Sequence, residues 1–352
     1  MNARRVDVLL PNDIDDPATP SGGNTYDRRV CRGLADLGWE VREHAVAGAW
    51  PQPAPGERAG LAAVLAALPG AGLVLVDGLI ASAVPDVLAG HCARLRLVVL
   101  MHMPLGHAAE RAALAAAAAV VTTSRWSRRR VLELHGLASE RVHAAPPGVD
   151  AAPRTACSAD GTRLLCVAAV LPDKGHDVLV EALATVRELP WSLVCVGTTA
   201  RDPAFARGLH DRARRHGIAD RIRFTGPRTG ADLAAAYAAA DLLVLASRAE
   251  TYGMVVTEAL AHGLPVLGTT AGGLPEGLGS APDGSLPGLL VPPGDTAALA
   301  AGLRRWLLDA DERNRIRNSA VMRRTTLTGW ALTARLVSDA LCTVATHESA
   351  GR

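Results

Sequence analysis

Residues 164–186, LLCVAAVLPDKGHDVLVEALATV, pass from a short apolar run through a polar loop into a helical pattern. The run from Leu164 to Val170 has the length and character of a strand buried on both faces. Apolar residues then recur at helical spacing from Val178 to Val186, so Lys174 lies in a strand-to-helix loop, where open α/β sheets bind ligands. Lys174 is the one lysine among 37 lysine and arginine residues, which favours a role for a compact ammonium. The alternative is a single codon that escaped a nucleotide bias.

The same alternation of apolar runs and helical stretches extends over the whole chain. The other predicted strands are Val6–Leu10, Leu73–Val76, Leu97–Met101, Val120–Thr122, Ser192–Val196, Ile222–Phe224, Leu242–Leu245 and Pro265–Gly268. Short strands buried on both faces and separated by helices predict an α/β fold with doubly wound parallel sheets. Residues 144–161 are rich in Pro, Gly and small polar residues and lack periodicity, so we expect them to link two domains.

A chain of 352 residues exceeds what one hydrophobic core usually serves, so two domains are expected. We predict a first Rossmann-like domain over residues 1–150 and a second over residues 158–328, facing each other across a cleft lined by loops. The stretch 330–347 has an amphipathic spacing and is expected to form a helix that crosses back onto the first domain.

The composition excludes several classes of function. A net charge of +2 gives no global field, and aromatic residues make up only 3%, which together argue against a nucleic-acid binder. No segment is long and apolar enough for a signal-peptide core or a membrane span, so we expect a cytoplasmic protein. The six cysteines lie far apart without a Cys-x-x-Cys pair and are expected to be reduced. The sequence leaves the oligomeric state open.

The strongest local signal is residues 247–266, SRAETYGMVVTEALAHGLPV, which contain two carboxylates with seven residues between them. Gly253 is expected to open a helix, which places Glu250 in the preceding loop and Glu258 on the second turn. The free N–H groups of Met254 and Val255, with the positive end of the helix dipole, would form an anion site. Ionised carboxylates beside it are suited to bond sugar hydroxyls. The alternative is two solvated glutamates near a helix start.

Two weaker signals lie in the first half of the chain. Gly22 and Gly23 follow the first strand in a predicted loop, where main-chain amides can approach a phosphate or sugar closely. No Gly-x-Gly-x-x-Gly or Walker sequence occurs, which argues against a nicotinamide dehydrogenase and a nucleotide triphosphatase. His102 ends the predicted strand Leu97–Met101, although a lone histidine is more often a satisfied core residue. No histidine spacing indicates a metal site.

These residues resemble family 4 of the GT-B glycosyltransferases, which are retaining enzymes that use nucleotide sugars. The resemblance covers nearly the whole chain. Its most specific part is Glu250–Pro265, similar to the family's paired-glutamate motif, and the other matches are Pro172–Gly175, Gly22–Gly23 and Pro147–Asp150. It implies the GT-B fold, with two Rossmann-like domains and the donor held mainly by the second.

The resemblance also implies roles for individual residues. Lys174 would neutralise the donor diphosphate, Glu258 would bind the nucleotide ribose, and Glu250 would bind the transferred sugar. His102 matches a histidine that faces the sugar near the reacting centre. The other implied or neighbouring donor contacts are Gly22, Gly23, Gly253, Met254, Val255, Arg228 and Arg248.

The chain departs from the family at two positions. The family usually has an arginine five residues before its lysine, where this chain has Ala169, and its usual hinge asparagine is replaced by Pro147. The first departure removes half of the diphosphate clamp. The sequence still favours a metal-independent retaining transferase that moves a sugar from a nucleotide diphosphate, with UDP preferred, to a small soluble acceptor, without a cofactor. Two alternatives stay open: a non-catalytic nucleotide-sugar-binding or regulatory subunit, and an enzyme that hydrolyses or epimerises its donor.

Overall fold

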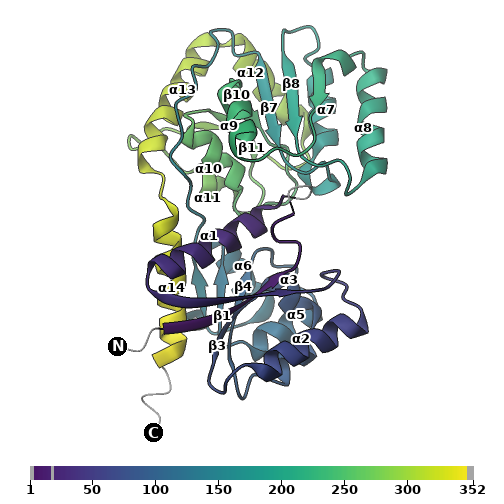
Figure 1. Ribbon diagram of the computed structural model, residues 1–352. Coiled ribbons are helices and arrows are strands. Elements are labelled where there is room, and N and C mark those ends of the chain that lie inside the picture. Colours follow the sequence, from purple (N-terminus) through teal and green to yellow (C-terminus); the bar gives the residue numbers. More distant parts are fainter. Residues whose placement is uncertain (1–3, 17–19, 347–352) are drawn as a thin grey trace. The chain divides into compact units, whose positions relative to one another are not determined.

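The computed structural model describes residues 4–16 and 20–346, which form two compact units. Unit 1 comprises the chain up to Asp16, then Ser21–Gly148, and the chain from Gly329 on; unit 2 comprises Val149–Thr328. Each described unit contains one six-stranded sheet whose strand pairs are all parallel. The prediction of two doubly wound α/β sheets is therefore confirmed (Figure 1).

Unit 1 has the strand order β2-β1-β3-β4-β5-β6. Its strands are β1 (Arg4–Pro11), β2 (Trp39–Val46), β3 (Leu73–Asp77), β4 (Arg96–Met101), β5 (Ala119–Thr122) and β6 (Val142–Ala144). Its helices are α1 (Gly22–Asp36), α2 (Pro55–Ala67), α3 (Gly78–Ala83), α4 (Pro85–Ala89), α5 (Ala108–Ala116), α6 (Arg125–His135) and α14 (Trp330–Thr346). The strand order reverses between β1 and β3, which makes this edge a switch point where ligands bind in such sheets.

Unit 2 has the strand order β12-β11-β10-β7-β8-β9. Its strands are β7 (Arg163–Val167), β8 (Ser192–Val196), β9 (Ile222–Phe224), β10 (Leu242–Val244), β11 (Val266–Thr269) and β12 (Gly288–Val291). Its helices are α7 (His176–Ala184), α8 (Pro203–Arg215), α9 (Gly230–Ala238), α10 (Met254–Ala261), α11 (Leu274–Leu278), α12 (Thr296–Leu308) and α13 (Ala310–Arg323). Counted from β7, this is the Rossmann order 3-2-1-4-5-6, and the switch point lies between β7 and β10.

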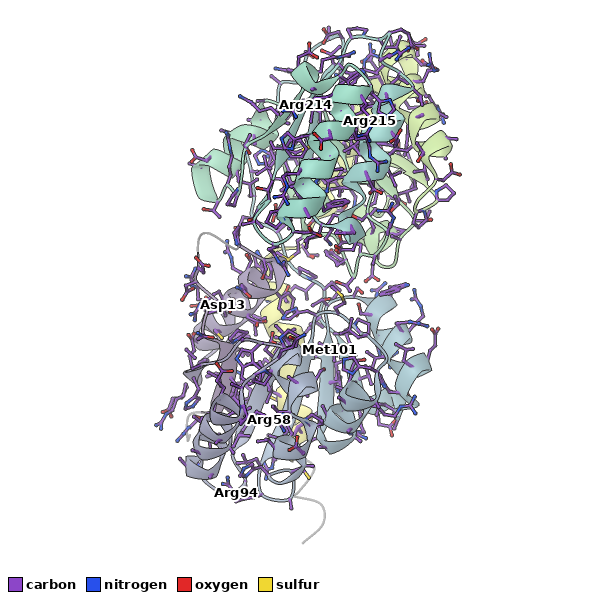
Figure 2. The ribbon with its side chains drawn as sticks, turned by 90° about the vertical axis from the view of Figure 1, so that its right-hand side faces the viewer. Asp13, Arg58, Arg94, Met101, Arg214 and Arg215 are labelled. Carbon is purple, nitrogen blue, oxygen red and sulfur yellow. The ribbon has the colours of Figure 1, made fainter. Side chains whose placement is uncertain are left out.

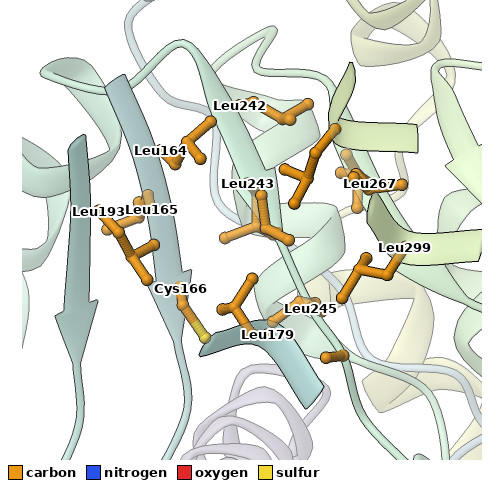
Figure 3. Close-up of a cluster of buried hydrophobic side chains, with 14 of the residues drawn as sticks. Leu164, Leu165, Cys166, Leu179, Leu193, Leu242, Leu243, Leu245, Leu267 and Leu299 are labelled. Carbon is orange, nitrogen blue, oxygen red and sulfur yellow. The ribbon is translucent and has the colours of Figure 1, made fainter. Parts of the chain in front are cut away.

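The core of unit 2 is built from aliphatic side chains on neighbouring strands (Figure 3). Leu243 of β10 stands in register with Leu165 of β7, and both are almost fully buried. Leu179 of α7 and Leu299 of α12 belong to the same cluster. This packing holds β7 and β10 side by side, so the loops that follow them emerge next to each other.

The C-terminal helix α14 packs on α1 within unit 1 (Figure 1). At the crossing, a Cβ on Gly33 would overlap the Cβ of Ala334, so two small residues allow the helices to approach closely. The hydroxyl of Thr333 donates to the carbonyl oxygen of Pro146 at 2.8 Å, and Trp330 meets Tyr26 edge-on at 5.9 Å. These contacts attach the end of the chain to its first unit.

Three strands escaped the sequence analysis, and each lies at a sheet edge: β2, β6 and β12. Edge strands are covered on fewer sides, so their sequences are short or mix charged with apolar residues. The boundary between the units, at Gly148 and Val149, falls inside the segment 144–161 that was expected to link two domains. The later part of this segment is bonded to unit 2, because Thr155 donates its N–H to the His262 carbonyl oxygen at 2.8 Å and Ser158 donates to Asp241. From residue 149 on, the chain is thus bonded to unit 2.

Arg214 and Arg215 of α8 are exposed, as expected for a solvated helix face (Figure 2). Within the described ranges, no helix combines the length and apolar character needed to cross a membrane.

Candidate functional site

The loop after β7 approaches the loop after β10 closely in unit 2. Lys174 ends a short 3-10 turn, Pro172–Lys174, and Gly175 then adopts a φ of 67°. A Cβ on Gly175 would overlap the carbonyl oxygen of Ala246, which lies just after β10. The positive φ and the close approach both require glycine at this position. The lysine loop is therefore shaped by its contact with the neighbouring loop.

Arg248 fastens these two loops together. Its guanidinium donates to both oxygens of Asp177 at 2.8 Å each and to the carbonyl oxygen of Pro172 at 2.6 Å. Its main-chain N–H donates to the carbonyl oxygen of Asp173 at 2.7 Å. A bidentate pair of this kind fixes geometry as well as charge. Arg248, which the sequence suggested as a donor contact, is thus engaged in holding the loop that carries Lys174.

Lys174 forms an ion pair with Glu250 across the two loops. Its Nζ lies 3.0 Å from Glu250 Oε2, and only 21% and 16% of the two side chains are exposed. Asp173 Oδ2 lies at 3.8 Å from the same ammonium. The main-chain N–H of Gly273 donates to the Glu250 carbonyl oxygen at 2.9 Å and holds that loop. A bound anion at Lys174 would share the ammonium with Glu250.

The helix α10 begins beside this ion pair without a side-chain cap. Gly253, its N-cap, has a φ of 82°, and a Cβ on it would stand 3.5 Å from Glu250 Cγ. No acidic residue lies in the first turn, and within the described chain no acceptor is found for the N–H groups of Met254 and Val255. Uncapped amides at a helix start attract anions, because the dipole adds to their partial charges.

Glu258 lies on the second turn of α10 and is hydrogen-bonded to a buried tyrosine. The hydroxyl of Tyr237, on α9, donates to Glu258 Oε2 at 2.7 Å. Burial raises the pKa of Glu258 from its usual value, and the Tyr237 hydrogen bond opposes that rise. Tyr237 in turn stacks on His262, with ring centroids 5.2 Å apart. The carboxylate is therefore oriented by a fixed donor rather than solvated on all sides.

In unit 1, the predicted residues lie near the β1/β3 switch point. Gly22 and Gly23 are the first residues of α1, capped by Ser21, and not part of the loop that the sequence predicted, because the Ser21 hydroxyl accepts from Asn24 N–H and starts the helix early. His102 directly follows Met101, the last residue of β4 (Figure 2). A Cβ on Gly23 would stand 3.4 Å from the His102 ring, so the first turn of α1 packs beside the imidazole.

Residues 161–309 match the family model described as glycosyl transferases group 1. The matched region lies within unit 2, which is therefore similar to this family over residues 161–309. A D-inositol 3-phosphate glycosyltransferase of Kineococcus radiotolerans is 34% identical over 243 residues, which cover 62% of this chain and 55% of that protein. One from Salinispora tropica is 35% identical over 49% of this chain and 40% of that protein. The chain thus spans about half the length of the curated relatives it matches.

Solved structures match the fold over nearly the whole chain. Sucrose-phosphate synthase of Thermosynechococcus elongatus gives a TM-score of 0.77 at 22% identity and covers 97% of this chain and 99% of its own. HepE of Anabaena, solved in complex with UDP-glucose, gives 0.76 at 19% identity and covers 96% and 99%. The assignment of the chain to the GT-B fold is confirmed by these neighbours.

Unit 2 brings most of the predicted donor residues to one switch point. Lys174 contacts Glu250, and the Glu250 side chain lies beside Gly253. Met254 and Val255 follow as the first residues of α10. Arg228 lies farther along the sheet, after β9, two strands from β7. Within the described ranges, no hydrogen bond or ion pair engages its side chain.

Sequence reasoning missed Tyr237, Asp27 and Asp77. Tyr237 is a lone polar aromatic in an alanine-rich helix, and Asp77 ends an apolar strand run, LVLVD. Both patterns are readable signals, because a polar group inside or directly after a buried element needs a partner. Asp27, within α1, carries no such signal.

Proposed function

We propose that this protein is a retaining glycosyltransferase that moves a sugar from a nucleotide diphosphate sugar to an acceptor hydroxyl. The observation that carries the proposal is the convergence of a cation and a helix start on one carboxylate. Lys174 contacts Glu250, and Glu250 packs beside Gly253, which opens α10. A diphosphate bound between the ammonium and the free amides would be stabilised as its negative charge grows on departure.

This arrangement supports a reaction that needs no metal. The ammonium and the helix dipole supply positive charge where metal-dependent transferases use an ion held by carboxylates. Glu250, in the loop, would bind hydroxyls of the transferred sugar, and Glu258, oriented by Tyr237, would bind the ribose. Each carboxylate accepts two hydroxyl donors at once.

The state of the two glutamates supports retention of configuration. Inversion by direct displacement needs a general base that takes the acceptor proton. Glu250 is neutralised by Lys174, and Glu258 is bound to Tyr237. With both carboxylates engaged, the departing phosphate is the base that retention would use.

UDP is the proposed nucleotide, and the acceptor is proposed to be a small soluble hydroxyl compound. HepE was solved with UDP-glucose, and the curated relatives are named for D-inositol 3-phosphate, a small molecule. A cytoplasmic location goes with this proposal and is supported by the six free cysteines.

A donor screen tests the proposal. The protein is incubated with UDP-sugars and a panel of polyol and sugar acceptors, with and without EDTA, and nucleotide release and anomeric configuration are followed by NMR. We expect acceptor-dependent release of UDP, with the donor anomer kept and EDTA without effect. Binding without turnover would favour the regulatory subunit, and UDP release or a changed sugar without acceptor would favour hydrolysis or epimerisation. Inverted product, or activity that requires an added divalent ion, would overturn the mechanism.

A further inference from the structure

Two buried aspartates face one imidazole at the switch point of unit 1. His102 Nε2 lies 2.8 Å from Asp27 Oδ1, on α1, and 3.4 Å from Asp77 Oδ2, at the end of β3. The aspartate side chains are 1% and 6% exposed, whereas the histidine side chain is 22% exposed. Asp77 Oδ1 also accepts the N–H groups of Leu79 and Ile80, which fixes its carboxylate at the start of α3.

The electrostatics of the cluster favour a charged imidazole. Burial opposes the charge, but the facing carboxylates, Asp27 first, raise the pKa of His102 to about 10. Burial, with Asp77 adding to it, raises the pKa of Asp27 to about 6, although His102 opposes the rise. Burial acts against ionisation of Asp77 too, yet the hydrogen bond from His102 holds its pKa below the usual value. Around neutral pH one imidazolium therefore faces two carboxylates.

The distances fit hydrogen bonds better than shared coordination of a metal ion. In the described part of the chain this is the one cluster of three such groups, with ligand atoms within 4.8 Å of one another. Two ligands of a tetrahedral ion, each about 2.0–2.1 Å from it, stand about 3.3 Å apart. The 2.8 Å between His102 Nε2 and Asp27 Oδ1 is shorter and typical of a charge-assisted N–H···O bond.

The rest of the ring is enclosed on one side and open on another. Tyr26 meets it edge-on at 5.5 Å, and its own hydroxyl donates to the Ala145 carbonyl oxygen, so that hydroxyl is already engaged. Gly23 adds no side chain on its face. The titratable groups that face the ring are Tyr26 and Asp27 from α1 and Asp77 from β3. Within the described residues, Nδ1 of His102 makes no hydrogen bond.

We propose that Asp27 and Asp77 are positioning residues that lock His102 as an imidazolium, with Nε2–H bound to both carboxylates and Nδ1–H presented to substrate. Because the cluster as a whole is negative, its partner is a neutral hydroxyl oxygen, of the sugar or the acceptor, rather than a phosphate. This inference rests on the proposed function for the identity of the substrate. It also means that His102 donates a hydrogen bond and does not act as a general base.

NMR titration tests the charge of His102 without substrate. The His102 signal is assigned by its loss in His102→Gln and followed from about pH 5.5 to about pH 8.5, in EDTA. In the wild type we expect it to keep imidazolium shifts throughout, and in Asp27→Asn to titrate within this range. Asp7→Asn is the matched control, because Asp7 Oδ1 pairs with His44 Nε2 at the same 2.8 Å but does not contact His102. A wild-type His102 that titrates near an ordinary value, or a signal that moves on removal of metal, would overturn the proposal.

Kinetics separate positioning from stability. In Asp27→Asn, kcat should be near the wild-type value at low pH and should fall about tenfold per pH unit above the new pKa, while KM for the donor changes little. Asp77→Asn, which can still cap α3, should show the same trend. A loss of kcat that is independent of pH would indicate a merely structural role and would contradict the proposal. If no transfer occurs in the wild type but the NMR result holds, the proposed function fails and the locked imidazolium stands.

Discussion

Replacing Lys174 by alanine should weaken UDP binding by more than the loss of one hydrogen bond. Loss of a hydrogen bond to a charged group costs about 1.5–3 kcal/mol. The ammonium also neutralises Glu250, 3.0 Å away, so its removal leaves a largely buried carboxylate near the diphosphate. If the ammonium touches both groups, they stand roughly 6 Å apart, and at an effective dielectric constant of about 20 the repulsion is at most about 3 kcal/mol.

Solvent screening reduces that repulsion to about 1–2 kcal/mol, because both side chains keep some contact with water. Lys174→Ala should therefore lose about 2.5–5 kcal/mol, which is roughly seventyfold to five-thousandfold in affinity. The double variant Lys174→Ala with Glu250→Gln removes the repulsion as well. We expect it to bind UDP about five to thirty times more tightly than Lys174→Ala alone.

Isothermal titration of UDP against the wild type, both single variants and the double variant measures this cycle directly. Arg212→Ala is the matched control, because Arg212 pairs with Glu181 at 2.7 Å on α8 and α7 of the same unit, outside the two site loops. Its UDP affinity should stay within about twofold of the wild type. Unchanged affinity in Lys174→Ala, or a double variant that binds no better than Lys174→Ala, would refute the reasoning.

Four further predictions concern three groups of unit 2 and His102 of unit 1. Glu250→Gln should lower kcat more than UDP affinity. Tyr237→Phe, which removes the 2.7 Å bond to Glu258, should instead weaken UDP binding about tenfold. Titration together with steady-state kinetics checks both variants, and equal losses of kcat and UDP affinity would count against the assignment. Gly175→Ala should lower stability by about 2 kcal/mol or more, visible as a lower Tm, because its φ of 67° and its carbonyl neighbour leave no room for a Cβ. The pKa of His102 is raised to about 10, so its contribution to the free energy of unfolding is fully present below its ordinary pKa and is lost as pH rises towards about 10. Denaturant titrations across that pH range would show this loss, and a free energy of unfolding that does not change with pH would contradict it.

Most of the strands that could be predicted lie inside a sheet; the edge strand Ile222–Phe224, whose middle residue is exposed, was predicted as well. Leu73–Asp77 and Arg96–Met101 lie inside the sheet of unit 1, and burial on both faces makes their sequences almost continuously apolar. Trp39–Val46 forms the edge of that sheet and is buried only at its two ends, so the charged residues between them conceal it. The two other missed edge strands have only three and four residues, which is too short for a periodic signal.

The positions of site residues could be predicted from the sequence where they lie on one loop or helix start. Their hydrogen-bond and ion-pair partners could not be predicted where these come from distant segments of the chain. Lys174, Glu250 and the start of α10 follow from local patterns, because a strand, a glycine and a helix specify where their side chains and amides lie. The pairing of Lys174 with Glu250 and of Glu258 with Tyr237 depends on which strands become neighbours. Sequence spacing does not contain that information, which is why the pairing of Arg248 with Asp177 was not predicted.

Because position 169 is alanine and not arginine, the Lys174–Glu250 pair would have a role in diphosphate binding as well as in the charge balance of the proposed site. Arg248 is bound to Asp177 and Pro172, whereas Lys174 contacts Glu250, whose side chain lies beside Gly253 at the start of α10. In the proposed function, diphosphate binding would then depend on one ammonium and on main-chain amides. The same ammonium pairs with Glu250, so in the proposed function binding and catalysis would share one ion pair, and a change at either residue should alter both. Only the double-variant cycle separates the two contributions, because it removes the charge of both partners at once.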